Sequence, residues 1–139
     1  MAVSLEHLTP DLVSRRYPAV DKIVTQELVD EYFSCMKYPL PVRAKVPVAF
    51  YACFREAEFK VFDDLRIDLK QLLHVSQSYT YFTSLQVGDV VRSQVSIQKV
   101  SSRKMGAGLV VFLELKNEYF RNQEKVAEAD GTVIVRELL

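Results

Sequence analysis

The sequence predicts a single α+β domain in which two helices precede an antiparallel sheet. In the first half of the chain, two segments carry apolar residues at helical spacing. From residue 74 onward, apolar and polar residues alternate, as they do in strands that bury one face. The connections between these expected strands are short, which favours antiparallel pairing. The length of 139 residues is typical of one domain.

The first helix is expected to begin after Thr25, whose hydroxyl can cap the free amides of a first turn. Apolar residues then recur every three or four positions as far as Met36. Pro39 and Pro41 end the pattern, because proline is rejected from a helix interior. Before this helix, only residues 20–24 are expected to be extended.

A second and more apolar helix is expected from Pro47 to Phe62. Proline suits the first position of a helix, where its missing amide costs nothing. One stripe of apolar residues follows at spacings of four, three and four: Phe50, Phe54, Ala57 and Val61. Further apolar residues widen this surface, so the helix is expected to lie centrally, against the inner face of the sheet.

Extended segments are expected to follow at residues 74–82, 90–100, 109–120 and 125–138. The tripeptide Val87-Gly88-Asp89 is typical of a turn. Residues 101–108 are expected to form a polar loop, and the state of residues 65–73 stays open. In the last segment, Asp130-Gly131 allows either a tight hairpin or a bulge in one long strand.

The composition excludes several classes of function. Eighteen basic residues balance eighteen acidic ones, which argues against a general nucleic-acid-binding protein. The longest uncharged apolar stretch, residues 46–54, holds a proline and is far too short to span a bilayer. No basic and apolar secretory leader opens the sequence, so a cytoplasmic protein is expected. Cys35 and Cys53 are expected to be buried free thiols; their spacing fits no metal site, and neither a metal nor a cofactor is expected.

The segment from Leu73 to Val90 carries a similarity to a known family. Its strand Leu73-His74-Val75-Ser76-Gln77-Ser78-Tyr79-Thr80-Tyr81 and the following Gly88-Asp89 turn resemble the LHGEQ-aromatic-x-Y strand and Gly-Asp turn of MaoC-like hydratases and dehydratases. The last two strands, over residues 122–136, are also similar to those of that family. The resemblance covers about residues 20–136. It is closest to the N-terminal half-domain type, the non-catalytic subunit type of heterodimeric 3-hydroxyacyl-thioester dehydratases.

This resemblance implies the hot-dog fold, in which a curved antiparallel sheet wraps a long central helix and two such units pair edge to edge. Residues 1–139 are then expected to form one hot-dog domain, with residues 1–19 as a peripheral N-terminal segment. Residues 47–62 become the central helix. Asp130-Gly131 is expected to be a bulge in the final strand rather than a hairpin.

Catalytic members of the family add water to acyl thioesters or remove it, using a D-x-N-P-x-H signature after the first helix. The chemistry needs one group to take the α-proton and another to protonate the leaving hydroxyl. The corresponding segment here, residues 36–46, contains neither Asp nor His. His74 matches a strand position, where a structural role is expected, and His7 lies in a polar stretch, where it is expected to be solvated.

The sequence therefore predicts a non-catalytic, acyl-binding and stabilising subunit of a (3R)-hydroxyacyl-ACP or -CoA dehydratase (enoyl hydratase) in fatty-acid or related acyl metabolism. The expected partners are acyl-ACP or acyl-CoA and a second hot-dog subunit, in a homodimer or in a heterodimer with a catalytic MaoC-like subunit. No nucleic acid or membrane is expected to bind. One histidine and five aromatic residues are candidates for the acyl channel, with plain core packing as the alternative for the aromatic ones: Phe50, Tyr51, Phe54, His74, Tyr79 and Tyr81.

Two other functions stay open at this point. Hot-dog thioesterases place an acid on the central helix to activate water, and Glu58 or Glu56 would supply it here. The competing interpretation joins both glutamates with Arg55 and Lys60 in a solvated polar edge of the helix. The third possibility is a homodimeric acyl-binding module without chemistry.

Overall fold

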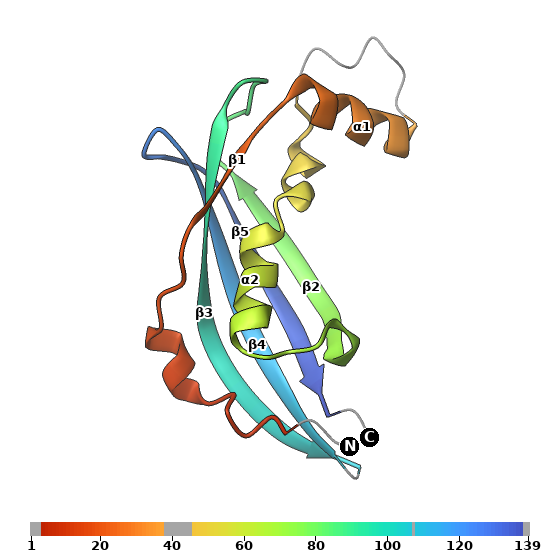
Figure 1. Ribbon diagram of the computed structural model, residues 1–139, viewed down its shortest axis with the longest axis vertical. Helices are drawn as coiled ribbons and strands as arrows, with labels where there is room; N and C mark the ends of the chain where they lie inside the picture. Colours follow the sequence, from red (N-terminus) through yellow and green to blue (C-terminus); the bar gives the residue numbers. More distant parts are fainter. Residues whose placement is uncertain (1–3, 38–45, 107, 138–139) are drawn as a thin grey trace.

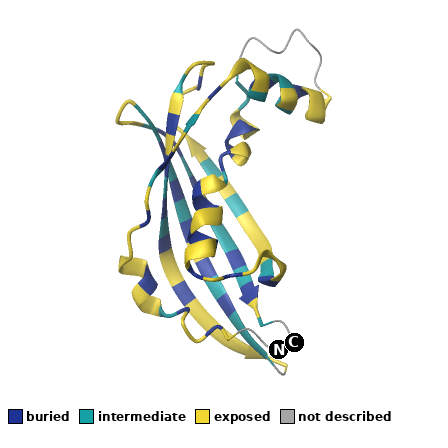
Figure 2. Ribbon diagram, viewed as in Figure 1, coloured by how far each residue is buried: buried dark blue, intermediate teal, exposed yellow. Residues whose placement is uncertain are grey.

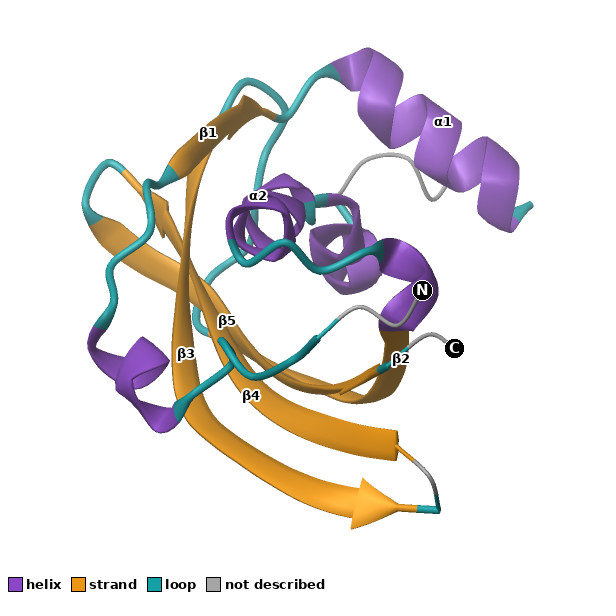
Figure 3. Ribbon diagram, turned by 60° about the horizontal axis from the view of Figure 1, so that its bottom comes forward, coloured by secondary structure: helices purple, strands orange, loops and turns teal. Residues whose placement is uncertain are grey.

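The structure, a computed structural model, describes residues 4–37, 46–106 and 108–137. Its centre is one five-stranded antiparallel sheet with the strand order β1-β3-β4-β5-β2. The strands are β1 (Val20–Ile23), β2 (Leu72–Tyr81), β3 (Val90–Met105), β4 (Gly108–Arg121) and β5 (Glu124–Arg136). The sheet curls around the helix α2 (Glu56–Asp64), as Figures 1 and 3 show. The predicted α+β class is confirmed.

Helix α1 (Gln26–Met36) begins where the sequence predicts it. The hydroxyl of Thr25 accepts a hydrogen bond from the amide of Leu28 at 3.1 Å, which satisfies one free donor of the first turn. Lys37 closes the helix in a left-handed conformation, with φ of 58°. The two prolines expected to end this helix lie outside the described residues. The helix projects beyond the end of the sheet (Figure 1).

The prediction of one continuous helix over residues 47–62 is wrong. A 3₁₀ helix, η3 (Val48–Cys53), comes first, and α2 begins only at Glu56. The predicted apolar stripe is nevertheless buried along its whole length. The break has a packing reason, because Phe50 and Phe54 belong to an aromatic cluster with α1, whereas α2 packs in a second cluster over the middle of the sheet. In one straight helix, the two phenylalanines and the apolar side of α2 would not face these two clusters at the same time.

Strand β3 is longer than predicted and replaces most of the expected loop over residues 101–108. Its polar end pairs with the start of β4, where Ser102 lies opposite Val111. The guanidinium of Arg103 lies 5.5 Å from the ring centroid of Phe112, a cation–π contact that covers the ring. Cross-strand contacts of this kind keep a polar segment in the sheet.

Gly131 lies inside a continuous β5 with no register shift at Asp130-Gly131, so the bulge expected there is wrong, and the alternative hairpin is not formed either. The register shifts in the pairing of β5 lie elsewhere: between His74 and Ser76 of β2, and in β5 at Val126, where the pairs Tyr119–Ala127 and Phe120–Lys125 leave one residue over. The glycine gives space to the adjacent strand, because a Cβ atom at position 131 would lie 2.5 Å from Oε1 of Gln77 and that side chain would have to move. The glycine therefore makes room for a side chain of the adjacent strand.

The segment before β1 runs outside the sheet and contributes to the core. It contains a short 3₁₀ helix, η1 (Pro10–Ser14), and a third 3₁₀ turn, η4 (Leu69–Gln71), precedes β2. Leu5, Leu8 and Leu12 are buried in the cluster that also holds the apolar side of α2. Figure 2 shows buried positions along α2 and along the central strands of the sheet. None of the helices in the described part of the chain has the length and hydropathy needed for a bilayer span.

Candidate functional site

The structure brings five of the six predicted channel residues into one aromatic cluster. The ring of Tyr51 on η3 lies 5.6 Å from that of Tyr81 on β2, and Tyr81 stacks on Tyr79 at 6.0 Å. Phe54 lies 5.3 Å from Phe50, edge to face, and the same cluster continues to Tyr51. The sequence therefore identified a set of residues that meet in space, at the junction of η3 and the end of β2.

Tyr119 of β4 also belongs to this cluster, and the sequence analysis missed it. Its ring lies 4.9 Å from that of Tyr51, and the side chain is almost fully buried. The signal was present, because the alternation that puts Leu113 and Leu115 on the buried face of β4 puts Tyr119 there as well.

Tyr51 is the polar member of this cluster that stands out. Its hydroxyl is buried and has no hydrogen-bond partner. Burial raises the pKa of Tyr51 to about 12, with smaller electrostatic effects from Arg121, Tyr81 and Asp89. The side chain also lines a cavity of about 250 Å³ beside the end of β2. The other lining residues are Val46, Pro47, Val48, Tyr81, Phe82, Thr83, Ser84 and Leu85.

His74 does not join the cluster. It lies exposed on β2, where its Nε2 donates to the carbonyl oxygen of Ser76 at 3.0 Å and to Oε1 of Gln77 at 2.9 Å. Both acceptors belong to its own strand, so the imidazole stabilises the local β2 irregularity. Its assignment to the acyl channel stays a prediction.

The two candidate glutamates of α2 have opposite environments. Glu58 is only 5% exposed, and its Oε2 accepts hydrogen bonds from Nε and Nη2 of Arg55 at 3.0 and 2.7 Å. Glu56 is largely exposed and lies 3.9 Å from the ammonium of Lys60. The interpretation of both as a solvated edge is therefore wrong for Glu58. The sequence held a signal for this burial, because Glu58 follows the apolar Phe54 by four residues and residues at that spacing share one face of a helix.

Asn117 is a second buried polar residue that the sequence analysis missed. It lies on the inner face of β4, opposite Val95 of β3 and Ala129 of β5, and is 2% exposed. Neither Nδ2 nor Oδ1 of its amide has a hydrogen-bond partner. Most buried amides in proteins are paired, so an unpaired one needs an explanation.

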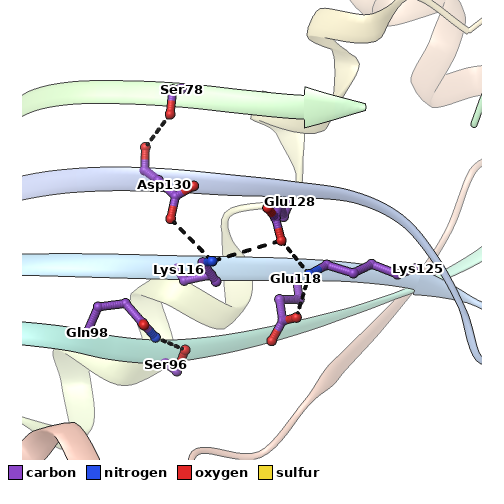
Figure 4. Close-up of polar contacts among 8 residues, drawn as sticks. All are labelled: Ser78, Ser96, Gln98, Lys116, Glu118, Lys125, Glu128 and Asp130. Carbon is purple, nitrogen blue, oxygen red and sulfur yellow. Dashed lines mark hydrogen bonds and ion pairs between the residues drawn. The ribbon is translucent and has the colours of Figure 1, made fainter. Parts of the chain in front are cut away.

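On the outer face of the sheet, in contrast, charged side chains form ion pairs with one another (Figure 4). The ammonium of Lys125 contacts the carboxylates of Glu118, at 2.8 Å, and Glu128. The ammonium of Lys116 lies 3.8 Å from Asp130 and 4.0 Å from Glu128. This network pairs five charged side chains of the outer face, Lys116, Glu118, Lys125, Glu128 and Asp130, whereas Tyr51 and Asn117 have unpaired buried polar atoms on the side of α2.

Cys35 and Cys53 are free thiols, as predicted, but both are exposed, so their predicted burial is wrong. Cys35 lies near the end of α1 and Cys53 at the end of η3, and partial burial raises the pKa of the Cys53 thiol. Within the described ranges, no group of three or more histidine, cysteine or acidic residues is arranged to hold a metal ion.

Three solved structures resemble the chain over most of its length. The first is the HadBC (3R)-hydroxyacyl-ACP dehydratase complex of Mycobacterium tuberculosis, with 20% identity, coverage of 86% of this chain and 92% of that chain, and a TM-score of 0.67. The second is the ChsH1-ChsH2 complex of the same organism, with 17% identity, coverage of 88% of this chain and 83% of that chain, and a TM-score of 0.63. The third is a MaoC-like dehydratase of Rhodospirillum rubrum, with 10% identity, coverage of 99% of both chains and a TM-score of 0.67. At these identities the likeness shows the fold, which is the predicted hot-dog fold.

Sequence comparison gives the family. Among curated proteins none matches the chain. The model of the family described as "FAS1-like, dehydratase domain region" matches residues 12–129, which is most of the sequence and includes α2 and every strand but the end of β5. The predicted resemblance to MaoC-like dehydratases is thus confirmed, and the chain belongs to the FAS1-like dehydratase-region family of hot-dog proteins.

Proposed function

We propose that the protein is a non-catalytic, acyl-binding and stabilising subunit of a 3-hydroxyacyl-thioester dehydratase complex. Its family supports a dehydratase-type subunit. The observation that carries the non-catalytic role is the composition of residues 36–46, which hold neither the aspartate nor the histidine of the resembled signature. Without them, this segment has no group to move the α-proton and none to protonate the leaving hydroxyl.

The two histidines of the sequence, His7 and His74, do not replace the missing aspartate and histidine. His7 donates from Nε2 to the carbonyl oxygen of Leu65 at 2.6 Å, and His74 is bonded within β2. In the part of the chain that the structure describes, neither is recorded in contact with a carboxylate that would orient it as a base. Glu58 is compensated by Arg55, which reduces its ability to act on a substrate.

The free edge of β2 supports a partner subunit. Leu73 and Val75 are 54% and 53% exposed, and within the described residues this strand pairs with β5 alone. An edge strand with apolar side chains and unpaired backbone groups is a template for another strand. Two of the similar structures are named as complexes of two chains, HadBC and ChsH1-ChsH2, which supports a related partner for this chain.

The aromatic cluster supports an acyl ligand. Aromatic and aliphatic walls with a few polar groups are typical of sites for apolar chains. The cavity next to Tyr51 and Tyr81 lies where the chain re-enters the described structure after the segment of the missing dyad. We propose that the acyl chain of an ACP or CoA thioester binds here, close to catalytic residues supplied by the partner.

The test is a hydratase assay on the purified protein with crotonyl- and longer enoyl-thioesters, alone and mixed with a MaoC-type subunit that carries the intact dyad. We expect no turnover by the protein alone and higher turnover by the mixture than by the partner alone. Removal of the partner's histidine is the control and should abolish activity. Robust hydration by the protein alone would contradict the proposal.

Thioester hydrolysis is the second candidate, because Glu58 is buried on the central helix, within electrostatic reach of Tyr79 and Tyr119. The matched pair Glu58→Gln and Glu56→Gln separates this activity from the proposed one. Hydrolysis that is present in the wild type, is lost in Glu58→Gln and survives in Glu56→Gln would favour the thioesterase. We expect no hydrolysis in any of the three proteins.

A further inference from the structure

The cavity proposed above for the acyl chain has an apolar floor. Of the residues that line it, only Tyr51 and Leu85 are buried, with exposed fractions of 3% and 4%. The hydroxyl of Tyr51 is closed to solvent, so the ring is the part of this residue that meets the cavity. The innermost surface is therefore an aromatic ring and a leucine side chain, which suit the end of an acyl chain.

The protein core is closed behind this floor. Both floor residues belong to a core cluster that contains three residues at most 1% exposed: Tyr119, Val126 and Ala127. The ring of Tyr51 lies 4.9 Å from that of Tyr119, in direct contact. Close-packed interiors of this kind leave few voids larger than a water molecule. An acyl chain that enters the cavity therefore ends at Tyr51 and Leu85.

Backbone hydrogen bonds fix one wall of the cavity. The amides of Phe82 and Thr83 both donate to the carbonyl oxygen of Val126 on β5, at 2.9 and 3.2 Å. The carbonyl oxygen of Ser84 accepts a hydrogen bond from Nη1 of Arg121 on β4 at 3.0 Å. The segment that follows β2 is thus tied to the neighbouring hairpin, and this wall is already in place before a ligand binds.

The opposite wall is the start of η3, where Pro47 and Val48 line the cavity. Val48 is 61% exposed and lies at the rim. Phe50 anchors this wall, because its ring packs edge to face at 5.7 Å from Tyr32 of α1 and at 5.3 Å from Phe54. Both walls and the floor are therefore held by contacts that do not depend on the ligand.

The volume of the cavity, about 250 Å³, sets the length of chain that it encloses. An apolar cavity of about 150 Å³ in a protein interior holds one benzene molecule, which has six carbon atoms. In proportion, the cavity beside Tyr51 has room for about ten carbon atoms. The remaining methylenes of a longer chain would stay in water, where they add little to the affinity.

We propose that the cavity selects acyl groups of up to about ten carbons and that Leu85 is a specificity-determining residue, which sets this limit together with Tyr51. The inference rests on the acyl-binding role proposed above and adds the class of substrate, short- and medium-chain acyl thioesters. Each methylene that enters an apolar site raises the affinity about fourfold. The gain should stop where the chain meets the floor.

The experiment measures binding of saturated acyl-pantetheines of increasing length, from butanoyl to tetradecanoyl in steps of two carbons, by calorimetry on the full chain. We expect Kd to fall about tenfold for each pair of added methylenes up to about eight to ten carbons. Beyond that length Kd should stay within about twofold, because the added methylenes find no apolar surface.

Two variants move the limit in opposite directions. Leu85→Ala lowers the floor and should extend the limit by about two carbons. Leu12→Ala is the matched control, because Leu12 is 5% exposed but lies in the other core cluster, so the same truncation there should leave the limit unchanged. Val48→Trp fills the cavity from the exposed rim, where it does not disturb the core, and should shorten the limit by at least two carbons.

The outcomes separate this inference from the function on which it rests. An affinity that keeps rising to tetradecanoyl-pantetheine would overturn the limit and leave acyl binding intact. A limit that neither Leu85→Ala nor Val48→Trp moves would overturn its assignment to this cavity. Failure of every chain to bind would overturn the proposed acyl-binding role and this inference with it.

Discussion

Glu58 is buried, although its charged neighbours on the same helix are exposed. Its neighbours Glu56 and Lys60 are exposed, whereas Glu58 is turned inward and held by two hydrogen bonds from Arg55. A buried carboxylate must be paired, since removal of water from a charge costs several kcal/mol. The pair with Arg55, which is itself partly exposed, meets that need.

Replacing Glu58 with glutamine should lower the free energy of unfolding by about 1–3 kcal/mol, because the guanidinium of Arg55 loses its partner. The partial exposure of Arg55 keeps the loss at the lower end of the range for buried pairs. The matched Glu56→Gln change should cost less than about 0.5 kcal/mol, as expected for an exposed i,i+4 pair. Urea denaturation of the two variants checks this, and equal losses would contradict it.

Among the elements, β2 combines two properties that rarely occur together in a monomer. It is a ten-residue strand at the edge of the sheet, and it exposes Leu73, Val75 and Tyr81. Proteins usually protect such an edge with charges or a covering segment. The described residues place neither on β2, which is consistent with coverage by the proposed second subunit.

A lysine at position 75 should therefore block assembly of the complex. In Val75→Lys the buried ammonium would oppose strand pairing, and we expect the dimer fraction to fall at least tenfold in sedimentation experiments, with or without the proposed catalytic partner. Leu69→Lys is the control, because Leu69 is equally exposed but lies in η4, before the strand. If both variants assemble as the wild type does, β2 is not the interface.

At the scale of the whole molecule, full or partial burial affects the ionisation of several tyrosines. Desolvation by burial is the main cause that raises the pKa of five tyrosines: Tyr17, Tyr51, Tyr79, Tyr81 and Tyr119. In the unfolded chain these groups lose their protons near pH 10, whereas in the folded protein they stay neutral to higher pH. Ionisation therefore favours the unfolded state as the pH rises through this range.

We expect stability to be constant around neutral pH and to fall between pH 10 and pH 12. Tyr51 alone accounts for about 2–3 kcal/mol of the loss, given a pKa of about 12 against an ordinary value of 10.0. Tyr51→Phe should reduce the alkaline loss by that amount and cost little at pH 7, because its hydroxyl has no partner.

Urea midpoints of the wild type and Tyr51→Phe over this pH range provide the measurement. Hydrogen bonds to Glu118 and Glu128 raise the pKa of Lys125. The ion pairs of Lys125 also weaken at high pH, but they do so in both proteins. The difference between the two proteins therefore isolates the tyrosine. Identical pH profiles would contradict the assignment.

The sequence by itself determined the α+β class, the start of α1 at Thr25, the strand alternation and most of the aromatic cluster. Each of these features depends on the spacing of apolar residues or on a capping group, and a segment of a few residues contains all of that information. It also showed that residues 36–46 lack the aspartate and histidine of the resembled dehydratases, which no fold can supply from within that segment.

Only the tertiary structure decided the rest. It broke the expected long helix at Phe54, because two core clusters lie in different directions. It turned Glu58 inward beside Arg55 and set Asn117 across from Ala129. These outcomes depend on strand register and on contacts between residues distant in the sequence, and a local pattern does not encode which side chain will stand opposite which.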